Sequence, residues 1–309
     1  MRIGVDLGGT KIELIALDDS SVTLLRQRVP TPSGDYAGTL NTIAALVVSA
    51  ERDLRQTGTV GVASPGAIST RTGLLKNSNS TVLNGRALDR DLSERLGRPV
   101  RLENDANCFA LSEAVDGAGA GCTVVFGVIL GTGVGGGIVV DGRLLVGPHR
   151  IAGEWGHNPL PWSRNTERPG AACYCGKDGC VETFLNGAGL AREYQSHGGN
   201  GALSALQIAS AAQTGDARAQ QSLAVYQDRL ARSFAVVVDL IDPDVIVLGG
   251  GLSNIDRLYD GLTQRVAAYA FSDAIDTPIV RALHGDSSGV RGAARLWPGG
   301  LDCPSKFAS

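Results

Sequence analysis

A strand–turn–strand pattern occurs twice in this chain and constrains its fold more than any other feature. Residues 4–11 read Gly-Val-Asp-Leu-Gly-Gly-Thr-Lys, and residues 127–134 read Gly-Val-Ile-Leu-Gly-Thr-Gly-Val. Each copy is an apolar strand that ends in a turn of glycine and threonine before a second apolar strand. The repeat predicts two related domains, each with a glycine hairpin. The length of 309 residues agrees with about two domains.

The order of the expected elements indicates an α/β fold. Runs of apolar and β-branched residues predict strands at residues 2–7, 12–17, 59–63, 100–102, 123–130, 137–140, 245–248 and 279–282. Apolar residues at helical spacing predict helices at about 40–54, 88–96, 106–115, 202–213, 217–241, 254–269 and 290–296. This alternation is typical of sheets covered by helices. We expect the tail, residues 298–309, to be disordered.

Charge and composition exclude several classes of protein. Lys and Arg number 28 and Asp and Glu number 31, a balance of −3 that argues against a general nucleic-acid binder. Residues 117–140 carry no charge and are long enough to cross a membrane, but nine of them are glycine. We therefore expect a buried strand–turn–strand there and no membrane partner. The chain opens without a signal-peptide pattern, so we expect a cytoplasmic protein.

Glycine turns after strands are suited to bind phosphate. Their backbone N–H groups are exposed, and a threonine adds a hydroxyl donor. Two matching turns, together with Gly249, Gly250 and Gly251 after another strand, favour this interpretation over plain tight hairpins. Gly131, Gly133 and Gly136 also match the dinucleotide-binding pattern, but that pattern requires a helix next, and a strand is expected here.

Two aspartates stand beside predicted strand ends. Asp6 adjoins the first glycine turn, where a carboxylate can hold hydrated Mg²⁺ or simply cap the turn. Asp105 follows a strand and opens a helix, so it or Asn104 is expected to cap that helix. Because a helix N-terminus favours an ionised carboxylate, Asp105 is also suited to accept a hydroxyl proton. Asn104 beside it is suited to orient a polyol.

The spacing of one histidine and three cysteines predicts a closed tetrahedral zinc site made of His157, Cys173, Cys175 and Cys180. A reducing compartment favours metal ligation over disulfides. Glu154 and Glu182 stand close in sequence to these ligands, so a metal would fix them too. They are expected either to accept hydrogen bonds from sugar hydroxyls or to be solvated loop acids.

Taken together, these motifs resemble the ROK family of bacterial sugar kinases. The stretches that carry the resemblance are residues 6–11, 103–107, 131–137, 154–157, 173–182 and 242–251. They follow the family's order along nearly the whole chain. The resemblance implies an actin/hexokinase-like (ribonuclease H-like) fold with two α/β domains and ATP in the cleft between them. We place a small domain at residues 1–116, completed by a C-terminal helix at about 289–309, and a large domain with the zinc loop at 117–288.

The resemblance also implies a role for each candidate residue. Asp105 is the catalytic base that accepts the proton of a sugar hydroxyl, usually O6, while the γ-phosphoryl group of ATP is transferred. The sugar site comprises Asn104, Asp105, Glu154, His157 and Glu182, with Gly66 close by. The nucleotide site, with Mg²⁺, comprises Asp6, Gly8, Gly9, Thr10, Lys11, Thr132 and Gly133, and Gly249, Gly250 and Gly251 face the adenosine. The resemblance also suggests a homodimer.

The preferred sugar is less sharply indicated. Residues 77–81, 153–162 and 284–289 resemble the fructokinase (manno/fructokinase) branch of the family, whereas residues 104–115 resemble the N-acetylglucosamine kinase branch. We expect phosphorylation of D-fructose to fructose 6-phosphate, with N-acetylglucosamine, glucose and mannose as alternatives.

A sugar-binding sensor or an actin-like scaffold is the non-enzyme alternative, against which Asp105 argues. Family repressors carry an N-terminal helix-turn-helix, for which a phosphate strand starting at residue 3 leaves no room.

Overall fold

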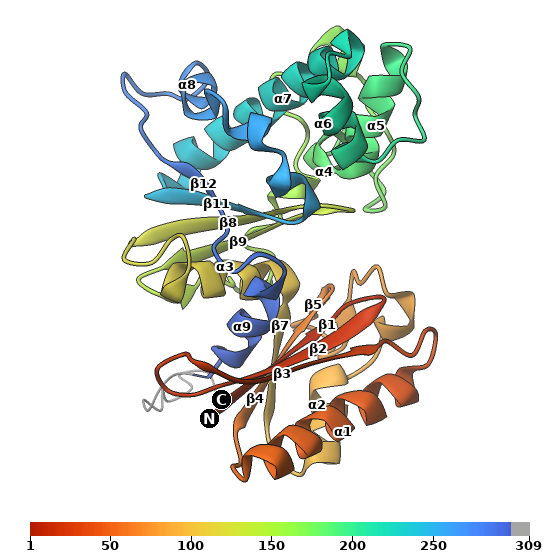
Figure 1. The fold of residues 1–309 in the computed structure, drawn as a ribbon, viewed down its shortest axis with the longest axis vertical. Coiled ribbons are helices and arrows are strands. Elements are labelled where there is room, and N and C mark those ends of the chain that lie inside the picture. The colour runs from red at the N-terminus through yellow and green to blue at the C-terminus, as the bar shows by residue number, and fades with distance from the viewer. Residues whose placement is uncertain (298–309) are drawn as a thin grey trace. The chain divides into compact units, whose positions relative to one another are not determined.

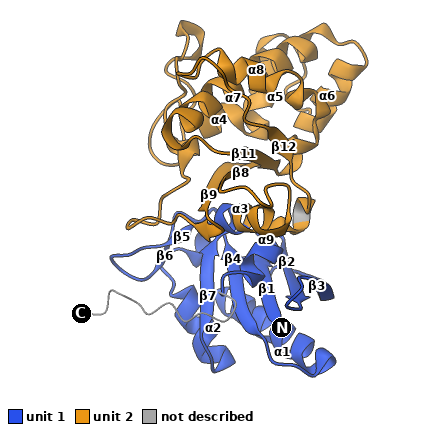
Figure 2. Cartoon of the chain, turned by 90° about the vertical axis from the view of Figure 1, so that its left-hand side faces the viewer, with its two compact units in different colours: residues 1–108, 289–309 blue, residues 109–288 orange. Residues whose placement is uncertain are grey.

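The two copies of the repeat form the central hairpins of two separate β-sheets in this computed structural model (Figure 1). The structure describes residues 1–297, so the tail expected to be disordered lies outside the described residues. The chain divides into two units, coloured separately in Figure 2. Unit 1 is Met1–Cys108 with Gly289–Ser309, and unit 2 is Phe109–Ser288.

The sheet of unit 1 has the strand order β3-β2-β1-β4-β7. Strand β1 is antiparallel to β2 and parallel to β4, β2 is antiparallel to β3, and β4 is parallel to β7. The strands are β1 (Arg2–Leu7), β2 (Lys11–Leu17), β3 (Thr23–Pro30), β4 (Thr59–Ser64) and β7 (Val100–Asn104). A short hairpin of β5 (Ala67–Ile68) and β6 (Leu75–Lys76) follows β4, and a 3-10 helix covers Thr81–Leu83.

Helices cover both faces of this sheet. Side chains of α1 (Tyr36–Leu54) and α2 (Leu88–Leu96) pack with Ile3, Val5, Val60 and Val62 in one buried cluster. Helix α9 (Ser288–Ala294) packs with Ile15 and Leu17. Because side chains alternate along a strand, Gly4 faces away from Ile3 and Val5. A Cβ at Gly4 would lie 2.7 Å from the Ala294 nitrogen, so glycine allows α9 to approach the sheet.

The sheet of unit 2 has the order β10-β9-β8-β11-β12 and the same pattern of antiparallel and parallel pairs. Its strands are β8 (Val124–Leu130), β9 (Val134–Val140), β10 (Arg143–Leu144), β11 (Val245–Gly249) and β12 (Ile279–Arg281). Residues 124–140 of the charge-free stretch thus form the predicted strand–turn–strand. Among the described residues, no helix combines the length and the apolar character needed to cross a bilayer.

Helices also cover the sheet of unit 2. Phe109 and Ala110 of α3 (Asp105–Asp116) pack with Val125 and Val247. A Cβ at Gly127 would lie 2.7 Å from the Cα of Ala110, so the first glycine of each repeat admits a helix. A second buried cluster joins the sheet to α4 (Val181–Leu185), α5 (Gly187–Ser196), α6 (Ala205–Gln213), α7 (Ala217–Ile241) and α8 (Leu262–Ala267).

The main departures from the sequence prediction have local causes. The helix expected at 254–269 is wrong: two 3-10 helices, Gly251–Asn254 and Asp256–Tyr259, precede a short α8. Gly261 caps α8 with φ of 64°, a left-handed conformation that separates α8 from the preceding turn. Strand β3 was not predicted, because it is an edge strand whose Arg26 and Arg28 pair with the buried Glu13 at 2.6 and 2.7 Å.

Candidate functional site

The glycine turn of unit 1 joins β1 to β2 and is stabilised by hydrogen bonds within the turn and from Thr31. The Gly8 N–H donates to the Lys11 carbonyl at 3.0 Å, and the Thr31 hydroxyl and N–H donate to the carbonyls of Gly8 and Thr10 at 2.7 and 3.0 Å. A Cβ at Gly8 would lie 2.9 Å from the Lys11 oxygen, so the tight turn requires glycine. Gly9, Thr10 and Lys11 are exposed, as a phosphate-binding turn requires.

Asp6 lies at the end of β1 beside this turn. Burial raises the pKa of its carboxyl to about 7, and the nearby carboxylates of Asp105 and Glu13 add to the shift, while Lys11 and Arg28 oppose it. A Cβ at Gly289 would lie 3.4 Å from the Asp6 Oδ2, so α9 starts against this carboxyl. A carboxyl with this pKa is close to half protonated at neutral pH, and a bound cation would favour its charged form.

Asn104 and Asp105 stand where β7 passes into α3. Asn104 caps the helix: its Oδ1 accepts from the N–H groups of Ala106 and Asn107 at 2.9 and 3.3 Å. Its amide donates to the Gly66 carbonyl at 3.1 Å, which brings Gly66 beside the pair. The Asp105 Oδ1 also accepts from the Ala106 N–H, at 2.8 Å. The first turn of a helix favours an ionised carboxylate at this position.

Two residues of this arrangement were not singled out as functional from the sequence. Glu103 is buried, and its Oε1 accepts from the Asn104 N–H at 2.9 Å and from the Asn107 side-chain amide at 3.1 Å. These bonds hold the residues that flank Asp105 and so fix the start of α3. Glu103 lies on β7 and Asn107 on α3, so no single periodic pattern in the sequence predicts this pairing.

The glycine turn of unit 2 joins β8 to β9. The Gly131 N–H donates to the Gly133 carbonyl at 3.0 Å and closes the turn. Two further bonds come from the start of α4 and α5: the Val134 N–H donates to the Glu182 Oε2 at 3.0 Å, and the Gly187 N–H donates to the Gly131 carbonyl at 2.9 Å. Thr132 is exposed at the tip.

The three glycines at the end of β11 differ in their surroundings. A Cβ at Gly249 would lie 2.6 Å from the Cζ of the Phe109 ring, and one at Gly250 would lie 2.8 Å from the Leu130 carbonyl carbon. Gly250 also has φ of 80°. These two glycines are therefore required by packing and by the turn itself. Gly251 is exposed with open space where its side chain would be, and is the member best placed to contact a ligand.

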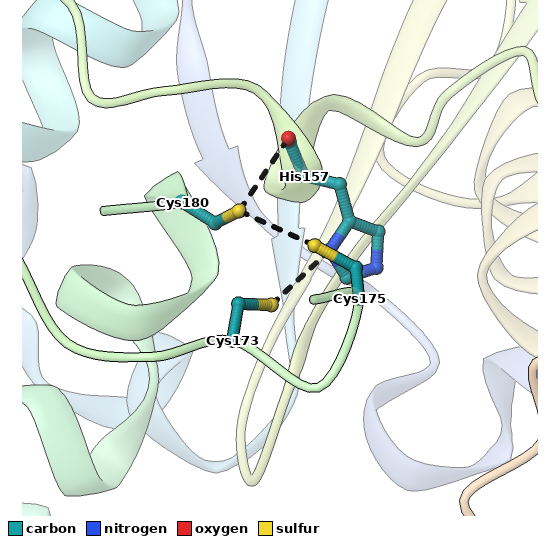
Figure 3. Close-up of side chains that lie close together, drawn as sticks. All are labelled: His157, Cys173, Cys175 and Cys180. Atoms are coloured by element: carbon teal, nitrogen blue, oxygen red, sulfur yellow. Dashed lines mark hydrogen bonds between the residues drawn. The ribbon is translucent and has the colours of Figure 1, made fainter. Parts of the chain in front are cut away.

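His157, Cys173, Cys175 and Cys180 converge in unit 2, as Figure 3 shows. Their candidate ligand atoms all lie within 4.8 Å of one another. The Cys175 and Cys180 sulfurs are 3.6 Å apart, and the Cys173 sulfur is 3.5 Å from the His157 Nδ1. For Zn–S bonds of about 2.3 Å, a tetrahedral site has sulfur–sulfur edges of about 3.8 Å. The donor set and its spacing therefore fit a zinc ion.

The acidity of the thiols is consistent with this fit. Burial raises the pKa of the Cys173 and Cys180 thiols, and the neighbouring sulfurs disfavour a second negative charge on Cys180. The exposed Cys175 has a lowered pKa, chiefly because the Lys177 N–H binds its sulfur. A divalent cation supplies the positive charge that allows several thiolates to lie together.

The residues around the cluster differ from the sequence expectation. The Glu154 carboxylate is half exposed, with its Oε2 3.9 Å from the His157 Nε2, whereas Glu182 is buried. Tyr174 was missed as a functional candidate: its hydroxyl lies 2.9 Å from the His157 Nε2. Its position between two cysteine ligands was the sequence signal from which its contact with the cluster could have been predicted.

A buried ion-pair network anchors the segment between His157 and the cysteines. The Glu167 carboxylate accepts from Arg229 at 2.9 Å and from Arg232 at 2.7 and 3.0 Å, and Arg232 also donates to the carbonyls of Pro161 and Trp162. Burial alone would raise the pKa of Glu167, but the hydrogen bonds from Arg232, Arg164 and Arg229 lower it to about 2. The sequence analysis did not predict this network.

The structure thus groups the predicted site residues by unit. Unit 1 contains Asp6, Gly8, Gly9, Thr10, Lys11, Gly66, Asn104 and Asp105. Unit 2 contains Thr132, Gly133, Glu154, His157, Cys173, Cys175, Cys180, Glu182, Gly249, Gly250 and Gly251. Within unit 2, Glu182 lies between the metal-ligand cluster and the glycine turn: one carboxylate oxygen is 3.9 Å from the Cys173 sulfur, and the other accepts from the Val134 N–H.

The sequence and the fold are similar to those of known proteins. The profile of the ROK family matches residues 2–299. N-acetyl-D-glucosamine kinases of Photobacterium profundum and Haemophilus influenzae are 41% identical over 300 residues and 42% identical over 302 residues; each match covers 96% of this chain and 99% of the relative. A ROK family glucokinase from Streptomyces griseus, solved in complex with glucose and AMPPNP, is similar with a TM-score of 0.76 and 28% identity, covering 96% of this chain and 98% of that chain.

Proposed function

This chain belongs to the ROK family, and on that premise we propose that it is an ATP-dependent hexose kinase whose preferred acceptor is N-acetyl-D-glucosamine. The observation that carries the choice of sugar is the identity of 41% and 42%, along almost the whole chain, to two N-acetyl-D-glucosamine kinases. This revises the sequence-based preference for D-fructose. Fructose remains the second candidate, supported by the resemblance of residues 77–81, 153–162 and 284–289 to the fructokinase branch.

In the proposed reaction, Asp105 is the general base. Its carboxylate accepts the proton of the acceptor hydroxyl as that oxygen bonds to the γ-phosphorus and ADP leaves. The capping of α3 by Asn104 and the bonds made by Glu103 support this role, because they hold the start of the helix in one conformation. Phosphoryl transfer depends mainly on such positioning and on charge neutralisation.

The two glycine turns bind the phosphates in this proposal. Gly9, Thr10 and Lys11 in unit 1, and Thr132 and Gly133 in unit 2, present backbone N–H groups, hydroxyls and one ammonium group. Asp6 would hold a Mg²⁺ ion, and Gly251 would contact the adenosine. The exposure of Thr10, Lys11, Thr132 and Gly251 supports these assignments.

The sugar hydroxyls bind Glu154, His157, Glu182 and Asn104. His157, Cys173, Cys175 and Cys180 hold zinc, and four protein ligands leave no position for a reactive water, so the metal is structural. Its chemical contribution is to fix the loop that carries the acids. The convergence of the four donor atoms within 4.8 Å supports this part of the proposal.

An assay of ADP release with four acceptors tests the function. N-acetyl-D-glucosamine is expected to give the highest kcat/KM, with fructose, glucose and mannose weaker. If fructose gives the highest value, the branch assignment changes while the hexose kinase assignment stands. Sugar-dependent ADP release with none of the four would contradict the proposed substrate class.

A further inference from the structure

The chain segment that follows the metal-ligand cluster ends on the glycine turn of unit 2. Cys180, a member of the cluster, is followed two residues later by Glu182 and seven residues later by Gly187. The Glu182 Oε2 accepts from the Val134 N–H at 3.0 Å, and the Gly187 N–H donates to the Gly131 carbonyl at 2.9 Å. Residues 180–187, called here the strut, therefore contact both ends of the turn.

The strut is held rigidly along its length. Cys180 caps α4, and its carbonyl accepts from the N–H and the hydroxyl of Thr183 at 2.9 and 2.8 Å. The Val181 N–H donates to the Asn158 carbonyl at 2.9 Å, and the Asn186 N–H donates to the Glu182 carbonyl at 3.0 Å. Cys180, Val181, Thr183 and Leu185 are all buried. A change in the position of Cys180 is therefore carried to Glu182.

The contact with the turn is close and involves a charged group. The Glu182 side chain is 9% exposed, and its other oxygen lies 3.9 Å from the Cys173 sulfur. A Cβ at Gly133 would lie 3.0 Å from the Glu182 Oε2, so the carboxylate lies against the turn itself. A hydrogen bond from a backbone N–H to a buried carboxylate is stronger than one between neutral groups.

We propose that Glu182 is a positioning residue for the phosphate-binding turn, and that residues 180–187 couple the cysteine–histidine cluster to nucleotide binding. The inference rests on the proposed phosphate-binding role of the turn. The sequence analysis associates Glu182 with the sugar site alone, but its carboxylate also accepts from the Val134 N–H beside the turn at 131–133. Loss of a thiolate is therefore expected to affect nucleotide binding as well as sugar binding.

Hydrogen exchange of the turn tests the coupling without any ligand. In the purified wild-type protein, the Val134 amide is expected to exchange slowly, because Glu182 accepts its proton. Glu182→Ala and Cys175→Ala are both expected to speed exchange in a peptide covering residues 130–136. Peptides from β1 and β2 in unit 1 serve as the internal reference and are expected to keep their wild-type rates.

Measurement of nucleotide binding tests whether loss of the Glu182 contact weakens the phosphate-binding turn. Calorimetry with Mg²⁺ and AMPPNP, without sugar, is expected to give a Kd about 10-fold higher for Glu182→Ala, which corresponds to about 1.4 kcal/mol. Glu182→Gln keeps an oxygen that can accept from Val134, so a smaller increase is expected. If Glu182→Ala folds poorly, the nucleotide Kd of Glu182→Gln is compared with that of wild type instead.

Gly187 provides an independent pair of variants. Proline is tolerated at the first residue of a helix, and Asn186 before it is extended with ψ of 169°, so Gly187→Pro is compatible with α5. It removes the N–H that binds Gly131. Gly187→Ala keeps the N–H, and its Cβ would meet the Gly131 oxygen at 3.7 Å, an ordinary contact distance. Proline is expected to raise the nucleotide Kd several-fold more than alanine.

The outcomes separate this inference from the proposed function. Wild-type exchange of residues 130–136 in Glu182→Ala, together with a nucleotide Kd within twofold of wild type, would overturn the coupling even if the protein is an active kinase. Faster exchange supports the coupling whether or not a sugar is phosphorylated. If the wild-type protein binds no nucleotide, the proposed function fails, and exchange in Glu182→Ala and Cys175→Ala still decides whether the strut holds the turn.

Discussion

The hydroxyl of Tyr174 lies 2.9 Å from the Nε2 of His157, and the two rings meet edge to face with centroids 5.0 Å apart. The other ring nitrogen, Nδ1, faces the Cys173 sulfur. With Nδ1 bound to a metal, Nε2 carries the proton and donates it to Tyr174. A sugar hydroxyl that binds His157 must compete with Tyr174 for that N–H group.

Replacement of Tyr174 by phenylalanine tests this competition. Tyr174→Phe removes the competing acceptor while keeping the ring, so the sugar KM is expected to fall about 2- to 5-fold, in the range of one net hydrogen bond. The kcat and the ATP KM are expected to stay close to wild type. Steady-state kinetics with the best acceptor measure the effect. A higher sugar KM would instead mean that Tyr174 orients the imidazole for binding.

Replacement of Asp105 by asparagine tests the catalytic base. Asparagine keeps an oxygen that can accept from the Ala106 N–H, so α3 is expected to start at the same residue. The kcat is expected to fall by about 10²–10⁴, the range for loss of a general base. Direct binding of AMPPNP is expected to be unchanged. The control is Asp53→Asn on the half-exposed end of α1; a near-normal kcat in Asp105→Asn would exclude this base.

The raised pKa of Asp6 predicts a pH-dependent stability. An ordinary aspartate titrates near pH 3.8, and Asp6 in the folded chain titrates near 7, chiefly because it is buried. The folded chain therefore holds this proton more tightly, and the stabilisation is fully present below pH 3.8 and is lost as the pH rises through 7.

Asp6→Asn removes this titration, so wild type is expected to lose stability relative to the variant as the pH rises. Between about pH 5 and pH 8 the expected change in their difference is about 1–2 kcal/mol, allowing for partial solvent access to the carboxyl. Urea denaturation at both pH values measures it. The variant is also expected to lose kinase activity, since Asp6 holds Mg²⁺ in the proposed reaction. A difference independent of pH would contradict the raised pKa.

The buried Glu167 predicts a large effect on stability. Glu167→Gln leaves the guanidinium groups of Arg229 and Arg232 buried without their carboxylate, which is expected to lower the free energy of unfolding by about 3 kcal/mol. Its matched control is Glu94→Gln on the solvent side of α2, expected within about 0.5 kcal/mol of wild type. Thermal melting of both variants decides the point, and equal melting temperatures would show that the network contributes little.

Most of the fold follows from local pattern in the sequence. The repeat at residues 4–11 and 127–134 predicted two related domains, each with a glycine hairpin, and each copy forms the hairpin of one sheet. The structure also gives the reason for the first glycine of the repeat: Gly4 and Gly127 each allow a helix to approach the sheet. Helix α2 matches its predicted bounds because its apolar spacing ends at Gly97, a left-handed C-cap. Strand β3 shows no clear alternation of apolar residues, because Arg26 and Arg28 on it pair with a buried acid, Glu13 on β2. A pattern of apolar residues therefore could not identify it.

The sequence predicted which residues form the candidate site better than it predicted the contacts between them. The four donor atoms of the cluster follow from cysteine and histidine spacing. Helix α3 starts at Asp105, one residue before the predicted start, and Asn104, one of the two expected caps, caps it. The bond between Glu182 and Val134 joins residues 48 positions apart and depends on how α4 packs against the turn, so spacing alone does not reveal it. The same holds for Glu167 and Arg232, which are 65 positions apart.

Loss of one thiolate ligand tests the metal site. Cys175 is exposed, so replacing its sulfur removes a ligand without opening a cavity in the core. Cys175→Ala is expected to contain well under one zinc per chain, to melt earlier, and to raise the KM of ATP as well as that of the sugar, because the strut carries the change to residues 131–134. Cys122→Ala, a cysteine outside the cluster, is the matched control and is expected to keep its zinc.

Elemental analysis of the wild-type protein, purified without chelator, is the first measurement. A metal-free protein with full activity would show that the cysteines are not a required zinc site, and a Cys175→Ala variant with only its sugar KM raised would separate the metal from the nucleotide turn.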